Sequence, residues 1–238
     1  MFGLLNTSDN HFYPSRCYQP GSASLITSLQ KQPLLVVLRP DAEVFYPGCH
    51  AGATASGFPL SWVKLLDDLN NTGIRHLELA WRPDSGWVNS IKILKSHWPD
   101  FSLGATSVCC ADAVRDAVQA GLTYATSPFL DDSLQKLAYQ LGLLLVPGVL
   151  SPTEIHQAIQ LGCNLVKLFP ASIVGPRYWR YLHAPLKPLP AVIAAGGLKV
   201  SDLDNWLGAG HNAVALGQSL LIDGGIDPSL YKWISQHA

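Results

Sequence analysis

The chain has 238 residues, of which 48% are hydrophobic and 14% are charged, and its formal net charge is -1 at pH 7. This apolar content is enough for a sizeable core and excludes an intrinsically disordered chain. The balanced charge, without a basic or acidic run, argues against nucleic acid or an anionic membrane as the main partner. The length fits one large α/β domain or two small ones.

The cysteines and the apolar stretches indicate the compartment. The chain has five cysteines, with one adjacent pair (Cys109-Cys110) and no C-x-x-C, which fits neither a disulfide framework nor a zinc site. No apolar stretch approaches the length of a membrane span, and the N-terminus has no basic region followed by an apolar one. We therefore expect a cytoplasmic protein with reduced thiols, no membrane partner and no secretory signal.

Taken in order, the chain begins with a polar segment and then repeats one unit. Residues 1–21 are rich in turn-forming residues and predict an extension outside the core. Apolar residues at helical spacing predict a short helix over 22–31. After it, an apolar run, a turn, a helical pattern and a glycine recur. The apolar runs, each predicted to be a strand, are 33–39, 74–80, 101–105, 122–127, 143–147, 164–169, 191–196 and 212–217.

Glycines and caps mark the ends of the predicted helices. A glycine in the left-handed conformation ends a helix at little steric cost, and five glycines stand where a helix would meet the next strand: Gly73, Gly121, Gly142, Gly162 and Gly210. The run Ser151 to Glu154 predicts an N-cap, a proline at the first helical position and a capping-box glutamate. Ser201 to Asp204 is a weaker version of that signal.

Eight strand–helix units predict a single (β/α)8 TIM barrel over 22–238, because eight parallel strands close into a barrel covered by helices. The alternative is an open doubly wound sheet. That fold needs a Gly-rich phosphate turn after the first strand, where Leu38-Arg39-Pro40-Asp41 stands instead. The first strand-to-helix connection, 42–58, is unusually long, and we expect it at the active-site mouth.

Lys167 lies inside the apolar run Leu165 to Phe169 and is the first candidate for chemistry. Lysine is rarely buried without a partner, and burial lowers the pKa of its ammonium and frees the amine to attack a ketone. An edge-strand lysine that extends to water is the alternative. The predicted barrel favours the buried lysine, because residues at the carboxyl ends of the strands meet at one face.

Other candidates lie at the same face of the predicted barrel. Glu78, at the end of the second strand, is expected to act as a general acid/base; the alternatives are a solvated carboxylate or a structural partner of Lys167. Arg82, just beyond it, is a surface residue or a clamp on a substrate carboxylate. Arg39, after the first strand, has the same two interpretations, with carboxylate or phosphate as its partner.

Glycines near the last two strands predict an anion site. Gly196 and Gly197 follow the seventh strand, and Gly217 with Ser219 follows the eighth. In barrels of this type, backbone N–H groups and a helix N-terminus at these two places commonly hold a phosphate. The histidines show no ligand spacing, so no metal site is predicted.

These residues resemble the class I aldolases that cleave 2-keto-3-deoxy-6-phosphogluconate and 4-hydroxy-2-oxoglutarate. The run 166–171 resembles the K-x-F-P-A signature of that family, and 77–82 resembles its L-E-x-x-x-R segment. The run 104–108, G-A-T-S-V, stands where the family usually has G-A-G-T-V. Ser127-Pro128, Pro147-Gly148-Val149 and Ala195-Gly196-Gly197-Leu198 follow in the expected order, and the resemblance covers about 32–221.

The resemblance implies a role for each candidate. Lys167 would form a Schiff base with the C2 ketone, and Glu78 would be the general acid/base. The substrate-binding residues would be Arg82 and Ser107 on the pyruvate carboxylate, Phe169 on the pyruvate carbons, and Arg39 and Pro128. Gly196, Gly197 and Ser219 would hold the distal phosphate. The resemblance implies no metal or other cofactor, a small keto-acid substrate and a homo-oligomer, typically a trimer.

Three functional hypotheses remain open at this point. The first is an aldolase that gives pyruvate and glyceraldehyde 3-phosphate, and the second is a 4-hydroxy-2-oxoglutarate aldolase that gives pyruvate and glyoxylate. The sequence departs from the family near the acceptor end, where Phe129, Ser172 and Ala194-Ala195 replace glycine, glutamate and proline-threonine. The third hypothesis is a barrel that has lost catalysis and binds a partner through 42–58.

Overall fold

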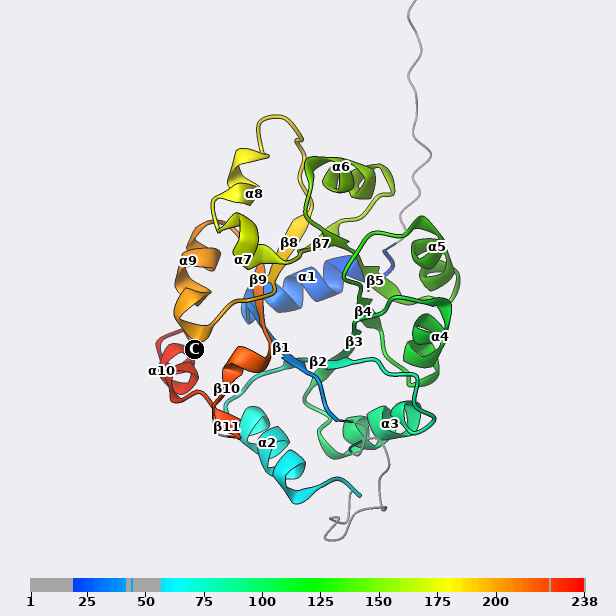
Figure 1. Cartoon of the computed structure of the whole chain (residues 1–238), viewed down its shortest axis with the longest axis vertical. Coiled ribbons are helices and arrows are strands. Elements are labelled where there is room, and N and C mark those ends of the chain that lie inside the picture. Colours follow the sequence, from blue (N-terminus) through cyan, green and yellow to red (C-terminus); the bar gives the residue numbers. More distant parts are fainter. Residues whose placement is uncertain (1–18, 42–43, 45–56, 223, 238) are drawn as a thin grey trace, which may run out of the picture.

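The computed structural model describes residues 19–41, 44, 57–222 and 224–237. Within these ranges a parallel sheet runs in the order β5-β4-β3-β2-β1-β9-β8-β7-β6 and curls into a barrel, with helices on its outside (Figure 1). Its strands are β1 (Leu34–Leu38), β2 (His76–Ala80), β3 (Ser102–Thr106), β4 (Tyr124–Thr126), β5 (Leu144–Val146), β6 (Gly148–Val149), β7 (Leu165–Leu168), β8 (Ala191–Ala195) and β9 (Ala213–Leu216). All eight predicted strands are confirmed.

The fifth predicted strand is split at Pro147, which explains the ninth strand of the sheet. Proline has no N–H to donate to a neighbouring strand, so the ladder is interrupted there. β5 pairs with β4 on one side of the break, and β6 pairs with β7 on the other. Because β5 and β6 are the two ends of the sheet order and are joined through Pro147, the sheet closes on itself. The (β/α)8 barrel prediction is confirmed.

The helices follow the strands as the sequence predicted. Each of the five predicted corner glycines has a positive φ, between 72° for Gly121 and 98° for Gly210. The described helices are α1 (Ser22–Lys31), α2 (Leu60–Asn71), α3 (Trp87–His97), α4 (Ala111–Gln119), α5 (Asp132–Gln140), α6 (Pro152–Gln160), α7 (Ala171–Val174), α8 (Tyr178–Tyr181), α9 (Leu203–Gly208) and α10 (Pro228–His237), with short 3-10 helices η2 (Val200–Asp202) and η3 (Gln218–Leu220). A small antiparallel pair, β10 (Leu221–Ile222) and β11 (Gly225–Ile226), precedes α10.

The two predicted helix starts differ in outcome. At α6 the Ser151 hydroxyl accepts from the N–H of Glu154, whose carboxylate accepts from the N–H of Ser151 at 2.7 Å, so the capping box is confirmed. At the second site the prediction was wrong, because the turn begins at Val200 and the Asp202 carboxylate accepts from the N–H of Lys199 at 2.8 Å. Ser201 already lies inside the 3-10 turn, so its hydroxyl is not the N-cap.

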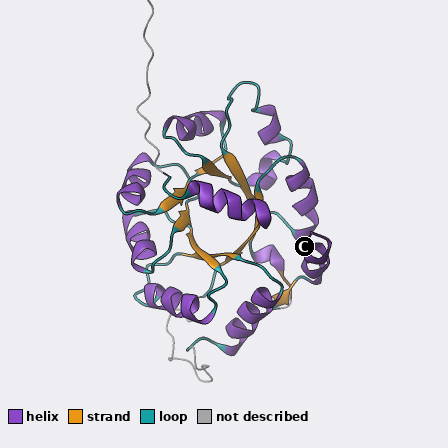
Figure 2. Cartoon of the chain, turned by 180° about the vertical axis from the view of Figure 1, so that it is seen from behind, coloured by secondary structure: helices purple, strands orange, loops and turns teal. Residues whose placement is uncertain are grey.

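Helix α1 covers the amino-terminal end of the barrel (Figure 2). Leu25 and Leu29 on this helix belong to the same buried cluster as the interior strand residues Leu35, Leu144 and Leu165. These apolar side chains close much of the amino-terminal end of the barrel.

The expected boundary at residue 21 needs a correction at Gln19. Its side chain is 2% exposed and forms hydrogen bonds with the backbone at the start of β7, which is far from it in the sequence. Its amide nitrogen donates to the carbonyl of Leu165 at 2.7 Å, and its amide oxygen accepts from the N–H groups of Asn164 and Leu165, both at 2.8 Å. Gln19 therefore belongs to the base of the barrel. Residues 1–18, and the 42–58 connection apart from residues 44, 57 and 58, lie outside the described residues.

Candidate active site

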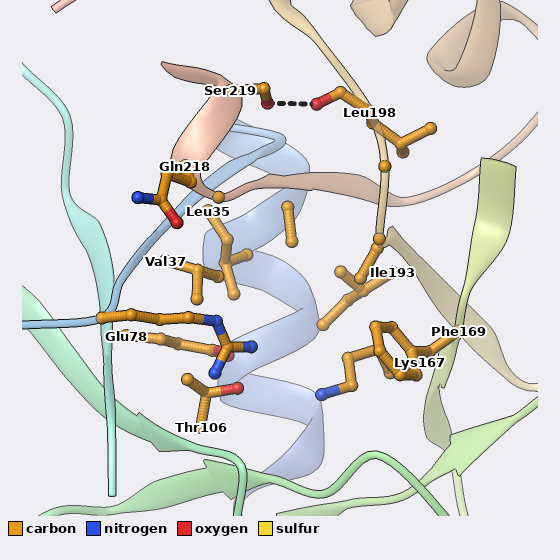
Figure 3. A pocket seen from close by; sticks show the side chains of 16 residues that line it. Leu35, Val37, Glu78, Thr106, Lys167, Phe169, Ile193, Leu198, Gln218 and Ser219 are labelled. Atoms are coloured by element: carbon orange, nitrogen blue, oxygen red, sulfur yellow. Dashed lines mark hydrogen bonds between the residues drawn. The ribbon is translucent and has the colours of Figure 1, made fainter. Parts of the chain in front are cut away.

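A cavity of about 340 Å³ opens at the carboxyl ends of the strands (Figure 3). It is lined by side chains from strands β1, β2, β3, β7, β8 and β9 and from the loops that follow them. Seven of the ten residues predicted for the site lie on its wall: Arg39, Glu78, Lys167, Phe169, Gly196, Gly197 and Ser219. The fold therefore brings together groups that are up to 180 positions apart in the sequence.

Lys167 extends into the cavity from β7 and is 6% exposed. Its Nζ donates to the Thr126 hydroxyl at 3.1 Å and lies 5.6 Å from the centre of the Phe169 ring. Burial lowers the pKa of Lys167 to about 8, although the charge of Glu78 opposes this effect. About a tenth of such a lysine is free amine at pH 7, against less than a thousandth for a lysine in water.

Glu78 faces Lys167 from β2 on the opposite wall and is 1% exposed (Figure 3). Burial raises the pKa of Glu78, while the charge of Lys167 and hydrogen bonds from Thr126 and Thr106 oppose the rise. One oxygen, Oε2, accepts from the Thr126 hydroxyl at 3.0 Å. The other, Oε1, has no hydrogen-bond partner among the described residues, which leaves it available to a bound molecule.

Arg39 is the arginine that lines the cavity. Its Nη1 donates to the Ser107 hydroxyl at 2.8 Å, and its charge acts on both Lys167 and Glu78. Ser107 has a φ of 62°, a left-handed backbone that a non-glycine residue adopts at a cost of about 1–3 kcal/mol. Ser107 does not reach the cavity wall, so its hydroxyl orients the guanidinium there.

Arg82 and Pro128 do not line the cavity, contrary to expectation. The Arg82 side chain is 42% exposed, and its Nε lies 3.2 Å from Oδ2 of Asp84, because the chain turns outward after β2 and the nearby carboxylate attracts the guanidinium. The backbone of Pro128 packs against Gly148, where an added Cβ would lie 2.3 Å from the Pro128 carbonyl. Pro128 therefore fixes the position of the broken fifth strand rather than a wall of the site.

The far end of the cavity is built from glycines. Gly196 and Gly197 have φ values of 95° and 75°, and a Cβ added to Gly197 would lie 2.3 Å from the Ser172 hydroxyl. The Ser219 hydroxyl donates to the carbonyl of Leu198. No lysine or arginine belongs to this end, because Arg39 and Lys167 are the two cations among the described lining residues and both interact with Glu78.

Residues 61–236, more than half of the chain, match the protein family described as "Aldolase: KDPG and KHG aldolase". The chain belongs to the KDPG and KHG aldolase family. It is therefore an aldolase, a carbon–carbon lyase, as the sequence predicted.

Curated proteins similar to this chain are named as aldolases. It is 29% identical over 162 residues to a 2-dehydro-3-deoxy-phosphogluconate aldolase of Haemophilus influenzae, covering 68% of this chain and 75% of the relative. It is 30% identical over 135 residues to the 2-dehydro-3-deoxy-6-phosphogalactonate aldolase of Escherichia coli, covering 56% of this chain and 66% of that protein.

Solved structures agree in fold. One is the 4-hydroxy-2-oxoglutarate and 2-dehydro-3-deoxyphosphogluconate aldolase from TTHB1, with a TM-score of 0.67, 25% identity and coverage of 89% of this chain and 95% of that one. Another is a KDPG aldolase from Legionella pneumophila, with a TM-score of 0.67, 21% identity and the same coverage. That structure holds pyruvate as a covalent carbinolamine.

Three polar side chains of the aldolase site were not among the sequence predictions. Thr106 and Gln218 line the cavity, and Thr126 is buried between Lys167 and Glu78. The alternation of faces along a strand contained the signal, because Thr106 is two residues from Gly104 and Thr126 is two residues from the inward Tyr124. A threonine at the last inward position of a barrel strand is therefore a site candidate.

Metal ligands, membrane spans and thiols complete the description of the aldolase. In the ranges that the structure describes, no group of three or more His, Cys, Asp or Glu side chains could hold a metal ion. A search of the same residues finds no helix with the length and apolar character to cross a membrane. Cys109 and Cys110 are free thiols, and burial raises the pKa of Cys109.

Proposed function

We propose that this aldolase cleaves 2-keto-3-deoxy-6-phosphogluconate to pyruvate and glyceraldehyde 3-phosphate through a Schiff base on Lys167. One observation carries the proposal: a buried amine with a pKa of about 8 faces a buried carboxyl across a cavity of about 340 Å³. Such an amine is free often enough at neutral pH to attack a ketone. Substrates that carry a ketone beside a carboxylate fit this end of the cavity.

The proposed reaction begins at the C2 ketone. The free amine of Lys167 adds to C2 to give a carbinolamine, which loses water to form a protonated imine. Glu78 then removes the proton of the C4 hydroxyl, the C3–C4 bond breaks, and its electron pair moves into the imine to give an enamine. Protonation at C3 and addition of water release pyruvate and the free lysine. The raised pKa of Glu78 suits it to accept and return the same proton.

Arg39 is proposed to bind the carboxylate of the keto acid. Its planar guanidinium suits a carboxylate, and it lies at the cavity end that holds Lys167 and Glu78. Ser107 holds the guanidinium in place. The resemblance assigns the carboxylate to Arg82, which would have to leave Asp84 and turn inward to reach it. The position of Arg39 favours it as the anion partner in this chain.

The acceptor end admits a second candidate function. A phosphate there would be held by backbone N–H groups near Gly196 and Gly197, since no lining cation belongs to that end. The lack of a cation equally favours 4-hydroxy-2-oxoglutarate, whose cleavage gives glyoxylate instead of a phosphorylated aldehyde. Comparing KM for the phosphorylated substrate with KM for 4-hydroxy-2-oxoglutarate distinguishes the two functions. A lower KM for the phosphorylated substrate favours the first, and a lower KM for 4-hydroxy-2-oxoglutarate favours the second.

Borohydride trapping tests the mechanism. The expected result is a pyruvate adduct that maps to Lys167 and is absent from Lys167→Met. A folded wild-type protein that forms no adduct at any pyruvate concentration overturns the Schiff-base proposal and favours a barrel that binds a partner.

The proposal extends to the oligomeric state and the compartment. We propose a homotrimer by family resemblance, which light scattering of the purified protein checks. The described free thiols Cys109 and Cys110 support a cytoplasmic location, which localisation of a tagged full chain tests.

A further inference from the structure

A hydroxyl group links the two titratable groups of the site. The Thr126 hydroxyl accepts from Nζ of Lys167 at 3.1 Å and donates to Oε2 of Glu78 at 3.0 Å. Its side chain is fully buried, at 0% exposed. Within the described ranges no ion pair joins Lys167 directly to Glu78. The hydrogen-bonded path from the amine to the carboxyl therefore passes through Thr126.

The geometry points to Thr126 as a positioning residue that relays a proton between Lys167 and Glu78. A hydroxyl has one proton to donate and two lone pairs to accept with, so it can accept from the amine while it donates to the carboxylate. The inference deepens the proposed function and rests on it. It names a residue that acts through Lys167 and Glu78 without contacting the substrate.

The relay balances in protons and electrons. When the Lys167 ammonium loses a proton, its N–H bond breaks as an O–H bond forms on Thr126. The original O–H bond of Thr126 breaks in the same event, and that proton passes to Oε2 of Glu78. The hydroxyl ends with one proton, as it began, while the amine and the carboxyl become neutral. Glu78 then gives this proton to the carbinolamine hydroxyl, which leaves as water, and the restored carboxylate can accept the C4 hydroxyl proton at Oε1.

A second hydroxyl lies beside the relay. Oγ1 of Thr106 lies 2.9 Å from Oγ1 of Thr126, and its side chain is 3% exposed on the wall beside Glu78. Thr106 stands at the glycine position of the G-A-G-T-V segment that this chain resembles. The hydroxyl is thus an addition in this chain. It gives Thr126 a third partner, and hydrogen bonding from both threonines offsets part of the rise in the pKa of Glu78.

The burial of both groups makes a relay useful. Burial lowers the pKa of Lys167 to about 8 and raises the pKa of Glu78, so the two proton affinities approach each other. Transfer between them therefore costs less than it would between a lysine and a glutamate in water. A purely structural Thr126 would satisfy the amine without affecting how fast it loses its proton, and this difference is measurable.

The test compares Thr126→Val, which removes the hydroxyl at nearly constant shape, with Thr126→Ser, which keeps it. Thr123→Val makes the same chemical change at an exposed position of the same segment and is the control. For each variant, the rate of borohydride trapping with pyruvate is measured against pH. The exchange of the pyruvate C3 protons with deuterium is followed by NMR.

We expect two opposite changes in Thr126→Val. Without the hydroxyl the ammonium loses an acceptor, so the pKa of Lys167 falls and more free amine is present at pH 7. Trapping and exchange nevertheless slow by about tenfold, with KM for pyruvate changed less than about twofold. Thr126→Ser restores both rates to within about threefold, and Thr123→Val matches the wild type.

Two results overturn the relay: a Thr126→Val protein with wild-type rates and pH profile, or a Thr126→Ser protein as slow as Thr126→Val. A wild-type protein that forms no adduct overturns the proposed function instead. In that case, NMR titration of Lys167 after reductive methylation with labelled formaldehyde still tests the link. If the pKa of Lys167 is unchanged in Thr126→Val, the hydrogen-bonded link between Lys167 and Thr126 is disproved.

Discussion

The two ends of the cavity are built on different principles. At one end, Lys167 and Glu78 are nearly fully buried and are connected through a hydroxyl group. Burial lowers the pKa of Lys167 and raises the pKa of Glu78. At the other end, Gly196 and Gly197 present backbone without side chains, and no described lysine or arginine lines that end of the cavity. The first end is specified by side-chain chemistry and the second by backbone conformation.

This difference indicates which end of the cavity tolerates substitution and which does not. A desolvated amine and carboxyl are costly to place together unless they are used, so substitutions at that end should remove the chemistry. The glycine end can accept or lose an anion through small backbone changes. We therefore expect mutations at the lysine end to change kcat and mutations at the glycine end to change KM.

The largest effect is expected from Lys167→Met. Methionine matches the length of the lysine side chain without its amine, so no covalent intermediate can form. We expect aldol cleavage to fall by at least about 10⁴-fold, measured by coupled assay of pyruvate release. Lys199→Met, at an exposed position, is the control. Activity within about tenfold of the wild type would mean that the reaction does not pass through this lysine.

The second largest effect is expected from Glu78→Gln. The amide keeps the shape and can accept from Thr126, but it cannot take up a proton. We expect kcat to fall by about 10²–10³-fold while KM changes little, because proton transfer is lost and binding is kept. Steady-state kinetics of the variant check this. A fall in KM of the same size as the fall in kcat would show that Glu78 acts on the ground state instead.

The third expectation concerns pH. Burial lowers the pKa of Lys167 to about 8, and only the unprotonated amine attacks a ketone. The fraction of free amine therefore rises with pH and levels off above about 8. Between pH 6 and pH 9, we expect pyruvate trapping to speed up by about a hundredfold. A profile that keeps rising to pH 10.5 would indicate an unperturbed lysine.

The sequence predicted the barrel because its signals are local. Each strand is an apolar run of a few residues, and each corner glycine needs only its own positive φ, so both can be recognised without long-range information. The inward positions of Lys167 and Glu78 followed from the alternation of faces along a strand.

Contacts between distant segments could not be predicted in the same way. Gln19 is buried because it bonds to Leu165, 146 positions away, and nothing in its neighbourhood in the sequence indicates that partner. The link through Thr126 depends on the lateral placement of β2, β4 and β7 around the barrel, which a single sequence does not give. The position of Arg82 also depends on a side-chain contact, because its guanidinium pairs with Asp84, two residues later, and lies off the cavity wall.

The fourth prediction compares the two arginines. Arg39→Met removes a cation from the cavity wall, and we expect kcat/KM to fall by about 30-fold through the loss of a charge-assisted contact to the carboxylate. Arg82→Met removes an exposed side chain paired with Asp84, and we expect less than about a threefold change. Steady-state kinetics of both variants decide. The reverse order of effects would mean that Arg82 turns inward when substrate binds.

The smallest effect is expected at the glycine end, from Gly197→Ala. The φ of 75° and the Ser172 hydroxyl, 2.3 Å from the added Cβ, force the backbone to shift. If that backbone binds phosphate, KM for the phosphorylated substrate rises by about tenfold while kcat stays within about twofold. Gly208→Ala, in α9 with open space around it, is the control. An equal rise in KM for 4-hydroxy-2-oxoglutarate would show that the glycines shape the cavity without reading the phosphate, which favours the unphosphorylated substrate.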